Sequence, residues 1–548
     1  MKYYLILLFL LGLNLTNAQI QMCGSTTPSN PISANSLFKR VGNVSVPVFF
    51  HIILATSGAG DVTDTQLGQQ IDVLNNLLIE GSGYQFYLAG YTKTRNDSWR
   101  NLVKLSQDEI DMKNSLGVDP THALNIYVTS TIDFLGWTYF PEDYSENSLQ
   151  HGVIVRTDCL PNGGYTNYDQ GKIAVHEAGH YLGLYHTFDD FGACKNADLV
   201  DDTPIHQKNI GCPNTNPPMD TCPQPGLDPI NNLMNYTNDP CRNYFTPGQF
   251  QRIKNITAEH KPSLRGNNIY INLTRSINYG DTWKLVAGNY LFSSGCYLIV
   301  NGTLNAIGTT SNPIIFTRSG SSNWGGIQFN SGSGGIIQYC TISNATQGIY
   351  IQETNSLSIS NSEIFNCSGH GMYVYRTNYA VQPAITNCNI HDNSSSTGIV
   401  MYWSSPDIRN SNIYNNYNGL GIADFSSPRL GHTNVSGNNN IHNNSNIGVY
   451  SKRYSNPLLG RNLTPFEAGN NIIASNTFRD AQAEDYCNVY AENNWWGSSP
   501  PNSTKIAALS GSMIDYDPYL SSPPSLSMAV GKESIVANDI EKRIVTSD

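Results

Sequence analysis

The chain has 548 residues, more than one compact core usually holds, so two or more folded units are expected. Charged residues make up 13% of the chain, and 31 Lys and Arg against 42 Asp and Glu give a net charge of -11. This acidic balance argues against a nucleic-acid-binding protein, which would need basic patches to meet phosphates. An aromatic content of 10% with few charges argues against a disordered chain.

The first 18 residues predict a secretory signal peptide. Lys2 precedes an apolar run from Tyr3 to Leu13, and Thr16 and Ala18 give a small-residue end before the expected cut. The run is shorter than the roughly 20 residues of a membrane span, and no later segment is long and apolar enough. We therefore expect a secreted protein without a transmembrane segment, whose 11 cysteines include at least one outside any intramolecular pair.

The next segments predict a short pro-segment and a mixed α+β domain. Residues 19–40 are polar and end in Lys39-Arg40, a pair that suits proteolytic trimming. Strands are expected over 46–54, 84–88, 123–128 and 152–155. A helix is expected after Thr63, which reads as an N-cap because Gln66 follows three residues later. This domain is expected to span residues 41–262.

From residue 263 to 520 the helical periodicity disappears and short β-type strings recur. GIYI, GMYV, GIVM, GIAD and GVYS start at 348, 371, 398, 421 and 448, so the period is 23 or 27 residues. Such a period predicts a solenoid whose rungs bury each other's Ile and Val. The region resembles the right-handed parallel β-helix family, with first rungs in 296–320 and a closing NNWWG at 493–497. A β-sandwich is the alternative, and residues 521–548 are expected to be a linker or tail.

One motif in the α+β domain carries chemistry, the string HEAGHYLGLYH at 176–186. His176 and His180 share one face of a helix, so both imidazoles can reach one metal ion. Gly183 allows the chain to leave the helix sharply and bring His186 round as a third ligand. Three nitrogens and one open position are the arrangement of catalytic zinc, and Glu177 can take the proton of an attacking water.

The long motif followed by a Met-turn is the metzincin signature, and NLMNY at 232–236 follows here. Met234 is expected to form the apolar floor of the zinc site, and Tyr236 can donate a hydrogen bond to a tetrahedral intermediate. The strings VPVFFHIIL, LGWTYFPED, VDDTP and NLMNYTNDPC with FTPGQ look like the pappalysin family, with a ulilysin-like catalytic domain. The resemblance covers about 41–260 and implies an upper mixed sheet above a loop-rich lower lobe.

The loop-rich lobe contains four cysteines, which sequence alone could join in three ways. The resemblance implies the pairs Cys194–Cys222 and Cys212–Cys241. A second, structural zinc site is the rival interpretation, although the spacing is not CxxC.

Two acidic features of the lobe have expected roles. Asp198, Asp201, Asp202 and Thr203 form an oxygen-rich cluster that suits a hard cation, and the resemblance implies calcium there, with an ordinary solvated turn as the alternative. Asp239 matches an acidic residue of the family's pocket for the residue after the scissile bond. That match implies cleavage before Arg or Lys, with an exposed loop aspartate as the alternative.

Cys23-Gly24 lies near the expected mature N-terminus, where similar zymogens place a zinc-binding cysteine. A thiolate there would occupy the open metal position and keep the enzyme latent. Cys23 could instead pair with Cys159 or stay a spare thiol.

The sequence thus predicts a secreted zinc endopeptidase that acts on protein or peptide substrates, joined to a β-helix for binding or display. Tyr373, Tyr375, Tyr402 and Trp403 are possible contacts of the solenoid to a glycan or cell-surface ligand, and stacking between rungs is their alternative role. One rival is a carbohydrate-binding or carbohydrate-cleaving β-helix, although the acidic residues of the repeats are scattered. Another is a surface adhesin with a vestigial protease site.

Overall fold

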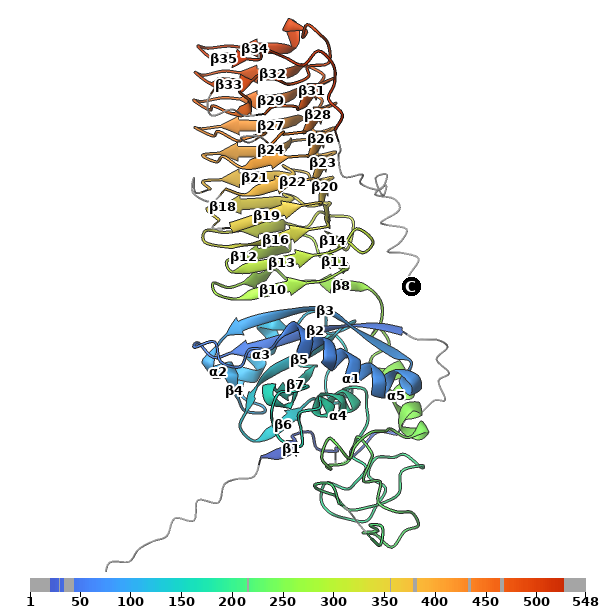
Figure 1. Cartoon of the computed structure of the whole chain (residues 1–548). Coiled ribbons are helices and arrows are strands. Elements are labelled where there is room, and N and C mark those ends of the chain that lie inside the picture. Colours follow the sequence, from blue (N-terminus) through green and yellow to red (C-terminus); the bar gives the residue numbers. More distant parts are fainter. Residues whose placement is uncertain are drawn as a thin grey trace, which may run out of the picture.

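The computed structural model describes residues 20–28, 30–33, 44–213, 216–354, 356–377, 382–431, 435–463 and 468–526. The expected signal peptide and most of the expected tail lie outside these residues. An α+β unit forms one end of the molecule, and a long stack of short strands rises from it (Figure 1).

The α+β unit combines a mixed sheet with helices and lies at the lower end of the molecule in Figure 1. Its helices are α1 (Asp64–Ser82), α2 (Asp97–Arg100), α3 (Gln107–Leu116), η1 (Thr157–Cys159), α4 (Lys172–Tyr181) and α5 (Pro247–His260). Its strands are β1 (Gln21–Cys23), β2 (Val44–Leu54), β3 (Tyr84–Arg95), β4 (Asn101–Leu102), β5 (Leu124–Thr131), β6 (Phe134–Trp137) and β7 (Val153–Arg156).

In the strand order β1-β6-β7-β5-β2-β3, strand β2 lies between β5 and β3. The last nine residues of β2 are buried, as expected for a strand covered on both faces. The predicted cap of α1 is confirmed, because Thr63 Oγ1 accepts from the Gln66 N–H at 3.2 Å and the Gln66 side chain accepts from the Thr63 N–H. The described residues between Leu182 and Thr246 contain no named helix or strand and form the loop-rich lobe.

The described residues from Asn268 to Asp515 form a parallel β-helix built from three long strand columns. The first column is β8 (Asn268–Ile271), β11 (Gly288–Phe292), β14 (Ile314–Arg318), β17 (Cys340–Ser343), β20 (Glu363–Phe365), β23 (Asn389–His391), β26 (Asn412–Tyr414), β28 (Asn440–His442) and β31 (Ile472–Ala474). The second is β9 (Arg275–Ile277), β12 (Tyr297–Val300), β15 (Gly326–Phe329), β18 (Ile349–Gln352), β21 (Met372–Tyr375), β24 (Thr397–Tyr402), β27 (Asn418–Ala423), β29 (Ile447–Ser451), β32 (Arg479–Ala483) and β34 (Ile506–Ala508). The third is β10 (Thr282–Leu285), β13 (Thr303–Ile307), β16 (Gly334–Gln338), β19 (Ser356–Ser360), β22 (Ala384–Thr386) and β25 (Asp407–Arg409). Near the far end, β30 (Leu458–Gly460), β33 (Asn488–Ala491) and β35 (Met513–Asp515) form a small sheet, and η2 (Ser503–Lys505) is a single turn.

Stacked side chains fill the inside of the solenoid. Ile364, Ile390 and Ile413 lie in register on successive rungs and are fully buried. Buried asparagines add a second ladder, because Asn393 donates to Asn416 at 2.9 Å and Asn416 donates to Asn444 at 3.2 Å. These contacts satisfy the buried amides and hold each turn above the next.

The solenoid and the α+β unit share one sheet. Strand β10 pairs antiparallel with β3, from Thr282 opposite Lys93 to Leu285 opposite Gly90. A Cβ on Gly90 would lie 2.7 Å from the Lys284 carbonyl oxygen, so the close crossing requires glycine. Residues predicted to belong to two separate domains therefore form a continuous sheet (Figure 1).

Apolar packing and hydrogen bonds also join the two units at this junction. Phe49 and Ala89 of the α+β unit belong to the core cluster that continues up the solenoid. Tyr290 donates its hydroxyl to the Ala89 carbonyl at 2.8 Å, and the Tyr270 N–H donates to Asp119 at 2.7 Å. The first rungs consequently cover an apolar face of the α+β unit.

Candidate metal centre and cleft

Helix α4 carries the first two predicted metal ligands. His176 and His180 lie on the same face, and both side chains are fully buried. The helix ends at Tyr181, and Gly183 follows in a left-handed conformation with φ 99°. A Cβ on Gly183 would approach Ile256 to 2.4 Å, so both the backbone angle and the packing favour glycine. The turn returns the chain so that His186 faces the two helical histidines.

The three imidazoles converge through their Nε2 atoms, which lie 3.1–3.3 Å from one another. His176 Nδ1 lies 2.7 Å from the Leu233 carbonyl oxygen and His180 Nδ1 lies 2.7 Å from that of Leu184. Since a carbonyl can only accept, Nδ1 carries the proton in both rings and Nε2 keeps its lone pair. Burial lowers the pKa of both histidines well below the usual value, which keeps the rings neutral.

This arrangement fits a zinc ion. Nitrogen ligands of a tetrahedral zinc at about 2.0–2.1 Å from the metal lie about 3.3–3.4 Å apart, close to the separations between these Nε2 atoms. Without a cation, three lone pairs would face each other in a buried site. Cys23, His176, His180 and His186 form the one group of metal-type ligands found among the described residues, with all ligand atoms within 4.8 Å.

Glu177 lies beside the histidines and is fully buried. Its Oε2 is 3.4 Å from Cys23 Sγ and 3.4 Å from Ser25 Oγ, whereas Oε1 has no hydrogen-bond partner. Burial raises the pKa of Glu177 to about 8, and the hydrogen bonds from Cys23 and Ser25 oppose this rise. A carboxyl group with one free oxygen can exchange a proton with a reacting group.

Met234 and Tyr236, the residues of the predicted Met-turn, lie close to the histidines. A Cβ on Gly179 would lie 2.7 Å from Met234 Sδ, so the thioether packs directly against α4 between the two ligands. The Tyr236 ring lies edge-on to His186 with centroids 4.9 Å apart, and its hydroxyl donates to the Cys23 carbonyl at 3.2 Å.

The N-terminal strand β1 occupies the edge of the sheet beside this site. It pairs parallel with β6, with Gln21 opposite Phe134 and Cys23 opposite Gly136. The next residue is glycine, and a Cβ on Gly24 would press against the Phe134 ring at about 3.0 Å. This edge pairing brings Cys23 to the histidine cluster as a free, buried thiol, and Cys159 is also unpaired.

The segment after β1 continues through the same cleft. Ser25 Oγ donates to the Thr138 carbonyl at 2.9 Å, and the Thr27 N–H donates to Asp190 at 2.8 Å. Further along, Arg252 donates to the Ile32 carbonyl at 3.1 Å. The described residues between Gln21 and Ile32 therefore lie across the candidate site.

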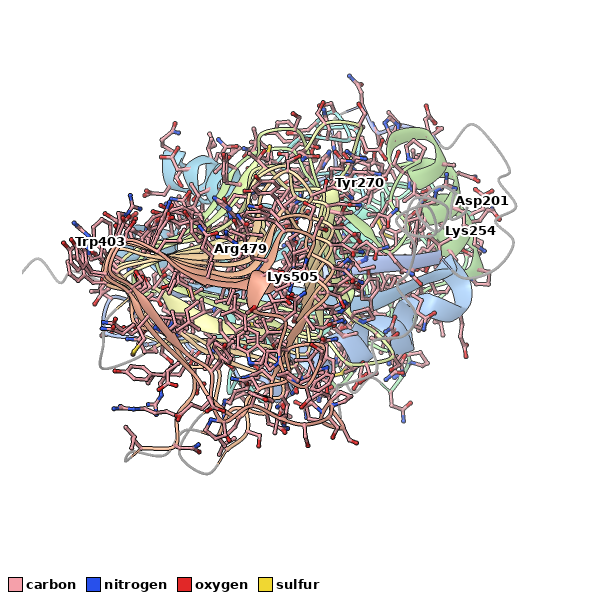
Figure 2. The ribbon with its side chains drawn as sticks, turned by 90° about the horizontal axis from the view of Figure 1, so that it is seen from above. Asp201, Lys254, Tyr270, Trp403, Arg479 and Lys505 are labelled. Atoms are coloured by element: carbon pink, nitrogen blue, oxygen red, sulfur yellow. A yellow bond between two sulfur atoms is a disulfide. The ribbon has the colours of Figure 1, made fainter. Side chains whose placement is uncertain are left out.

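The oxygen-rich cluster predicted for calcium is only partly assembled. Asp198 accepts from the Thr203 hydroxyl at 2.7 Å, and burial raises the pKa of Asp198 to about 7. Asp202 instead accepts from the Thr246 hydroxyl at 2.6 Å and thus serves the start of α5. Asp201 is exposed and lies at the rim of the molecule (Figure 2). Calcium binding at this cluster stays a prediction.

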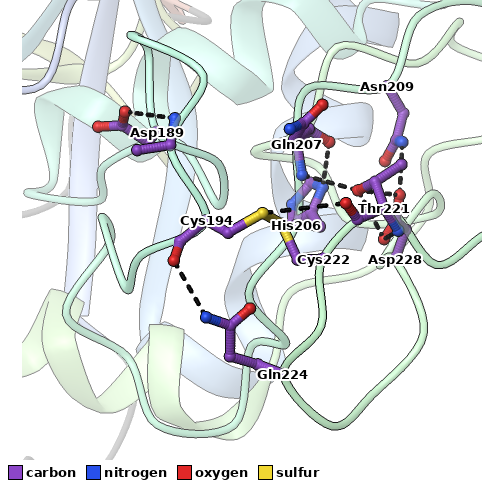
Figure 3. The surroundings of a disulfide bond; sticks show 10 residues. Asp189, Cys194, His206, Gln207, Asn209, Thr221, Cys222, Gln224 and Asp228 are labelled. Carbon is purple, nitrogen blue, oxygen red and sulfur yellow. Dashed lines mark hydrogen bonds between the residues drawn. A yellow bond between two sulfur atoms is a disulfide. The ribbon is translucent and has the colours of Figure 1, made fainter.

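Two disulfides cross-link the loop-rich lobe, and they join Cys194 to Cys222 and Cys212 to Cys241. This is the pairing that the resemblance implies. Around the first bond, the Gln224 side chain donates to the Cys194 carbonyl at 3.1 Å (Figure 3). Asp228 accepts from the neighbouring Thr221 N–H at 2.9 Å, so polar contacts and the disulfide together fix this loop.

Asp239 is placed differently from the expectation of a free pocket carboxylate. The side chain is fully buried, and Asp239 pairs with the equally buried Arg242 at 2.5 Å. Its second oxygen accepts from the Gln170 N–H at 3.0 Å. The alternative of an exposed loop aspartate is wrong, because the internal pair removes the carboxylate from solvent.

Sequence reasoning did not predict a strand at β6 and did not single out Asp190 or Arg242. Asp190 accepts from His186 Nδ1 at 2.8 Å, and its position four residues after the third ligand was the available signal. Arg242 follows the Met-turn, and no sequence motif around it predicts a functional role. Strand β6 has only four residues, too few for a clear alternation of apolar and polar positions.

The fold and the histidine cluster define a zinc metallopeptidase joined to a right-handed β-helix, and comparisons with known proteins agree. Residues 108–258 match the family described as Pregnancy-associated plasma protein-A, and residues 255–427 match the right handed beta helix region. An extracellular metalloprotease of Arthroderma benhamiae is 40% identical over 216 residues, which cover 38% of this chain and 76% of that protein. One of Pyricularia oryzae is 36% identical over 234 residues, 41% of this chain and 79% of that protein.

The chain belongs to the Pregnancy-associated plasma protein-A family of metalloproteases. Among solved structures, mature mirolysin of Tannerella forsythia in complex with a cleaved peptide is 25% identical and has a TM-score of 0.36. That likeness covers 40% of this chain and 97% of mirolysin. Within the described part of this chain, no helix is long and apolar enough to cross a membrane.

Proposed function

We propose that this protein is a secreted zinc endopeptidase that hydrolyses peptide bonds in proteins. The observation that carries the proposal is the convergence of three Nε2 atoms beside the buried carboxyl group of Glu177. The site lies next to a sheet edge that already holds one extended chain. An extended substrate can use the same edge, because strand addition forms main-chain hydrogen bonds that do not depend on the sequence of the substrate.

In this mechanism His176, His180 and His186 hold zinc, which when bound supplies Lewis-acid chemistry toward the scissile carbonyl and water. Glu177 accepts the proton of the attacking water and transfers it to the leaving amine. The Tyr236 hydroxyl, now donating to a main-chain carbonyl of the pro-segment, is free to donate to the developing oxyanion once that segment leaves. Strand β6 aligns the substrate, so the reacting carbonyl is positioned before proton transfer begins.

The direct test is hydrolysis of a peptide library by the full chain after removal of the pro-segment. Cleavage inside peptides should stop when a chelator removes zinc and return when zinc is restored. A folded, zinc-loaded protein that cleaves no peptide would overturn the proposal and favour a binding or adhesin function.

The pro-segment keeps the enzyme latent in this proposal. Cys23 Sγ lies within 4.8 Å of all three histidine ligand atoms, and β1 blocks the edge where substrate would bind. Because β1 pairs parallel with β6, the pro-segment runs in the same direction as β6. A substrate that added antiparallel to β6 would run in the opposite direction. Cleavage near Lys39-Arg40 would release the segment, although these two residues lie outside the described part of the chain.

We predict that Cys23→Ser raises peptide hydrolysis by the uncut chain at least about tenfold, because a hydroxyl is a much poorer zinc ligand than a thiolate. The measurement is the initial rate with an internal peptide before any proteolytic trimming. Cys159→Ser is the matched control, since Cys159 is also a buried free thiol but hydrogen-bonds only Asp158. Equal latency of both variants and wild type would exclude Cys23 as the switch.

The preference for Arg or Lys after the scissile bond depends on Asp239, and Arg242 competes for that carboxylate. We therefore expect only a weak basic preference in wild type. Arg242→Met should increase cleavage before Arg or Lys, relative to cleavage before uncharged residues, by roughly tenfold. The increase corresponds to one charge-assisted hydrogen bond between Asp239 and the substrate side chain. Peptides that differ only at this residue measure the ratio. A double variant with Asp239→Asn should lose the gain, and a strong basic preference already in wild type would contradict this reasoning.

A binding or display role is proposed for the solenoid, and a glycan ligand remains a prediction. The candidate aromatic residues mostly contact each other, with Tyr373 and Tyr402 centroids 5.5 Å apart and Tyr375 edge-on to Trp403. Trp403 lies at the margin of the solenoid farthest from Asp201 in the view from above (Figure 2). The acidic residues expected to be scattered include one pair, Glu363 and Asp392, that both contact His391.

A further inference from the structure

The three histidines differ in what holds their second ring nitrogen. His176 and His180 each donate Nδ1–H to a main-chain carbonyl, of Leu233 and Leu184. His186 donates instead to the Asp190 carboxylate, with Nδ1 2.8 Å from Oδ1. Among the described residues, Asp190 is therefore the one charged side chain that accepts from the Nδ1 of a histidine in this cluster.

The other oxygen of Asp190 contacts the pro-segment. Oδ2 accepts from the Thr27 main-chain N–H at 2.8 Å, four residues after Cys23. The Asp190 side chain is 13% exposed, so both hydrogen bonds are shielded from water. One carboxylate thus joins a metal ligand on one side to the chain that fills the cleft on the other.

The preceding residue shows that this arrangement is specific. Asp189 turns to its own loop, where Oδ2 accepts from the Ala193 N–H at 2.9 Å and Oδ1 pairs with Lys195 at 2.9 Å. Two adjacent aspartates of equal charge therefore have different partners, and only Asp190 reaches the histidine cluster.

We propose that Asp190 is a positioning residue that couples His186 to the main chain lying in the cleft, first the pro-segment and then the substrate. The inference rests on the proposed zinc peptidase function. A carboxylate on Nδ1 fixes the ring and makes Nε2 a stronger metal ligand. Because the Thr27 contact is to a main-chain N–H, departure of the pro-segment leaves an acceptor that a substrate N–H of any sequence can use.

Two substitutions separate the two contacts. Asp190→Ala removes both acceptors, so zinc should dissociate from the full chain about 10–100-fold more readily, the usual cost of losing such a partner. Asp190→Asn keeps one oxygen for His186 but turns an amide N–H₂ toward the substrate N–H. This variant should retain zinc within a fewfold of wild type, while KM rises about tenfold with little change in kcat.

The experiment is competition for Zn²⁺ against a chelator, together with steady-state kinetics after pro-segment removal. Asp189→Asn is the matched control and should leave zinc affinity unchanged, and His186→Ala is the reference for loss of a ligand. Wild-type zinc affinity in Asp190→Ala, beside a clear loss in His186→Ala, would overturn the inference and leave the proposed function intact. Wild-type zinc affinity in His186→Ala would instead overturn the zinc site itself. Unchanged KM in Asp190→Asn would remove the substrate contact from the inference.

Discussion

Glu177→Ala is expected to lower peptide hydrolysis by about a thousandfold while the protein keeps its zinc. The reduction follows from loss of the group that moves the proton, since a general base contributes roughly 10²–10⁴-fold to a rate. Zinc should stay because Glu177 contacts Cys23 and Ser25 rather than the imidazoles. The two measurements are kcat/KM of the activated chain and its bound zinc content.

His176→Ala is the control that separates the two effects, because it should lose both zinc and activity. A Glu177→Ala protein that retains a tenth or more of wild-type activity would contradict the proposed mechanism. Loss of zinc in that variant would instead place Glu177 among the groups that hold the metal.

Removal of the solenoid is expected to destabilise the α+β unit strongly. A chain that ends at Arg265 would expose the β3 edge between Gly90 and Lys93, together with Phe49 and Ala89 of the shared core. We expect the free energy of unfolding to fall by several kcal/mol. At about 2–4 °C per kcal/mol, this loss should lower the thermal midpoint by at least about 10 °C. The open edge should also promote aggregation.

Thermal unfolding with light scattering, in zinc-saturated buffer, measures both consequences. A matched control is Arg275→Ala in the full chain, which removes only the side-chain contacts to the Ser115 and Gly117 carbonyls and should shift the midpoint much less. A truncated protein that stays monomeric with the wild-type midpoint would show that the two units are independent.

Local patterns predicted the parts of this protein that depend on short stretches of sequence. The spacing of His176, His180 and His186 is set by helical geometry and one glycine turn, and the repeat period records the solenoid directly. The cap at Thr63 is equally local, because both partners lie within one turn.

The remaining features depend on contacts between distant segments. The pairing of β3 with β10 joins residues almost two hundred positions apart, and neither strand shows which neighbour it will take. Asp202 hydrogen-bonds Thr246 at the start of α5, a residue 44 positions away, whereas Asp198 hydrogen-bonds the nearby Thr203. The buried pair of Asp239 and Arg242 is likewise a matter of packing, which composition and spacing do not record.

The shared sheet also fixes the direction of the solenoid axis relative to the α+β unit. The nine strands of the first solenoid column, about 4.8 Å apart, make a rod roughly 40 Å long whose axis cannot swivel freely about a hinge, because its base is hydrogen-bonded to β3. A partner bound at the far end of the solenoid would therefore hold the catalytic cleft at a fixed distance and orientation from the point of attachment. Insertion or deletion of one rung would change that reach in steps of about 5 Å without touching a residue of the zinc site.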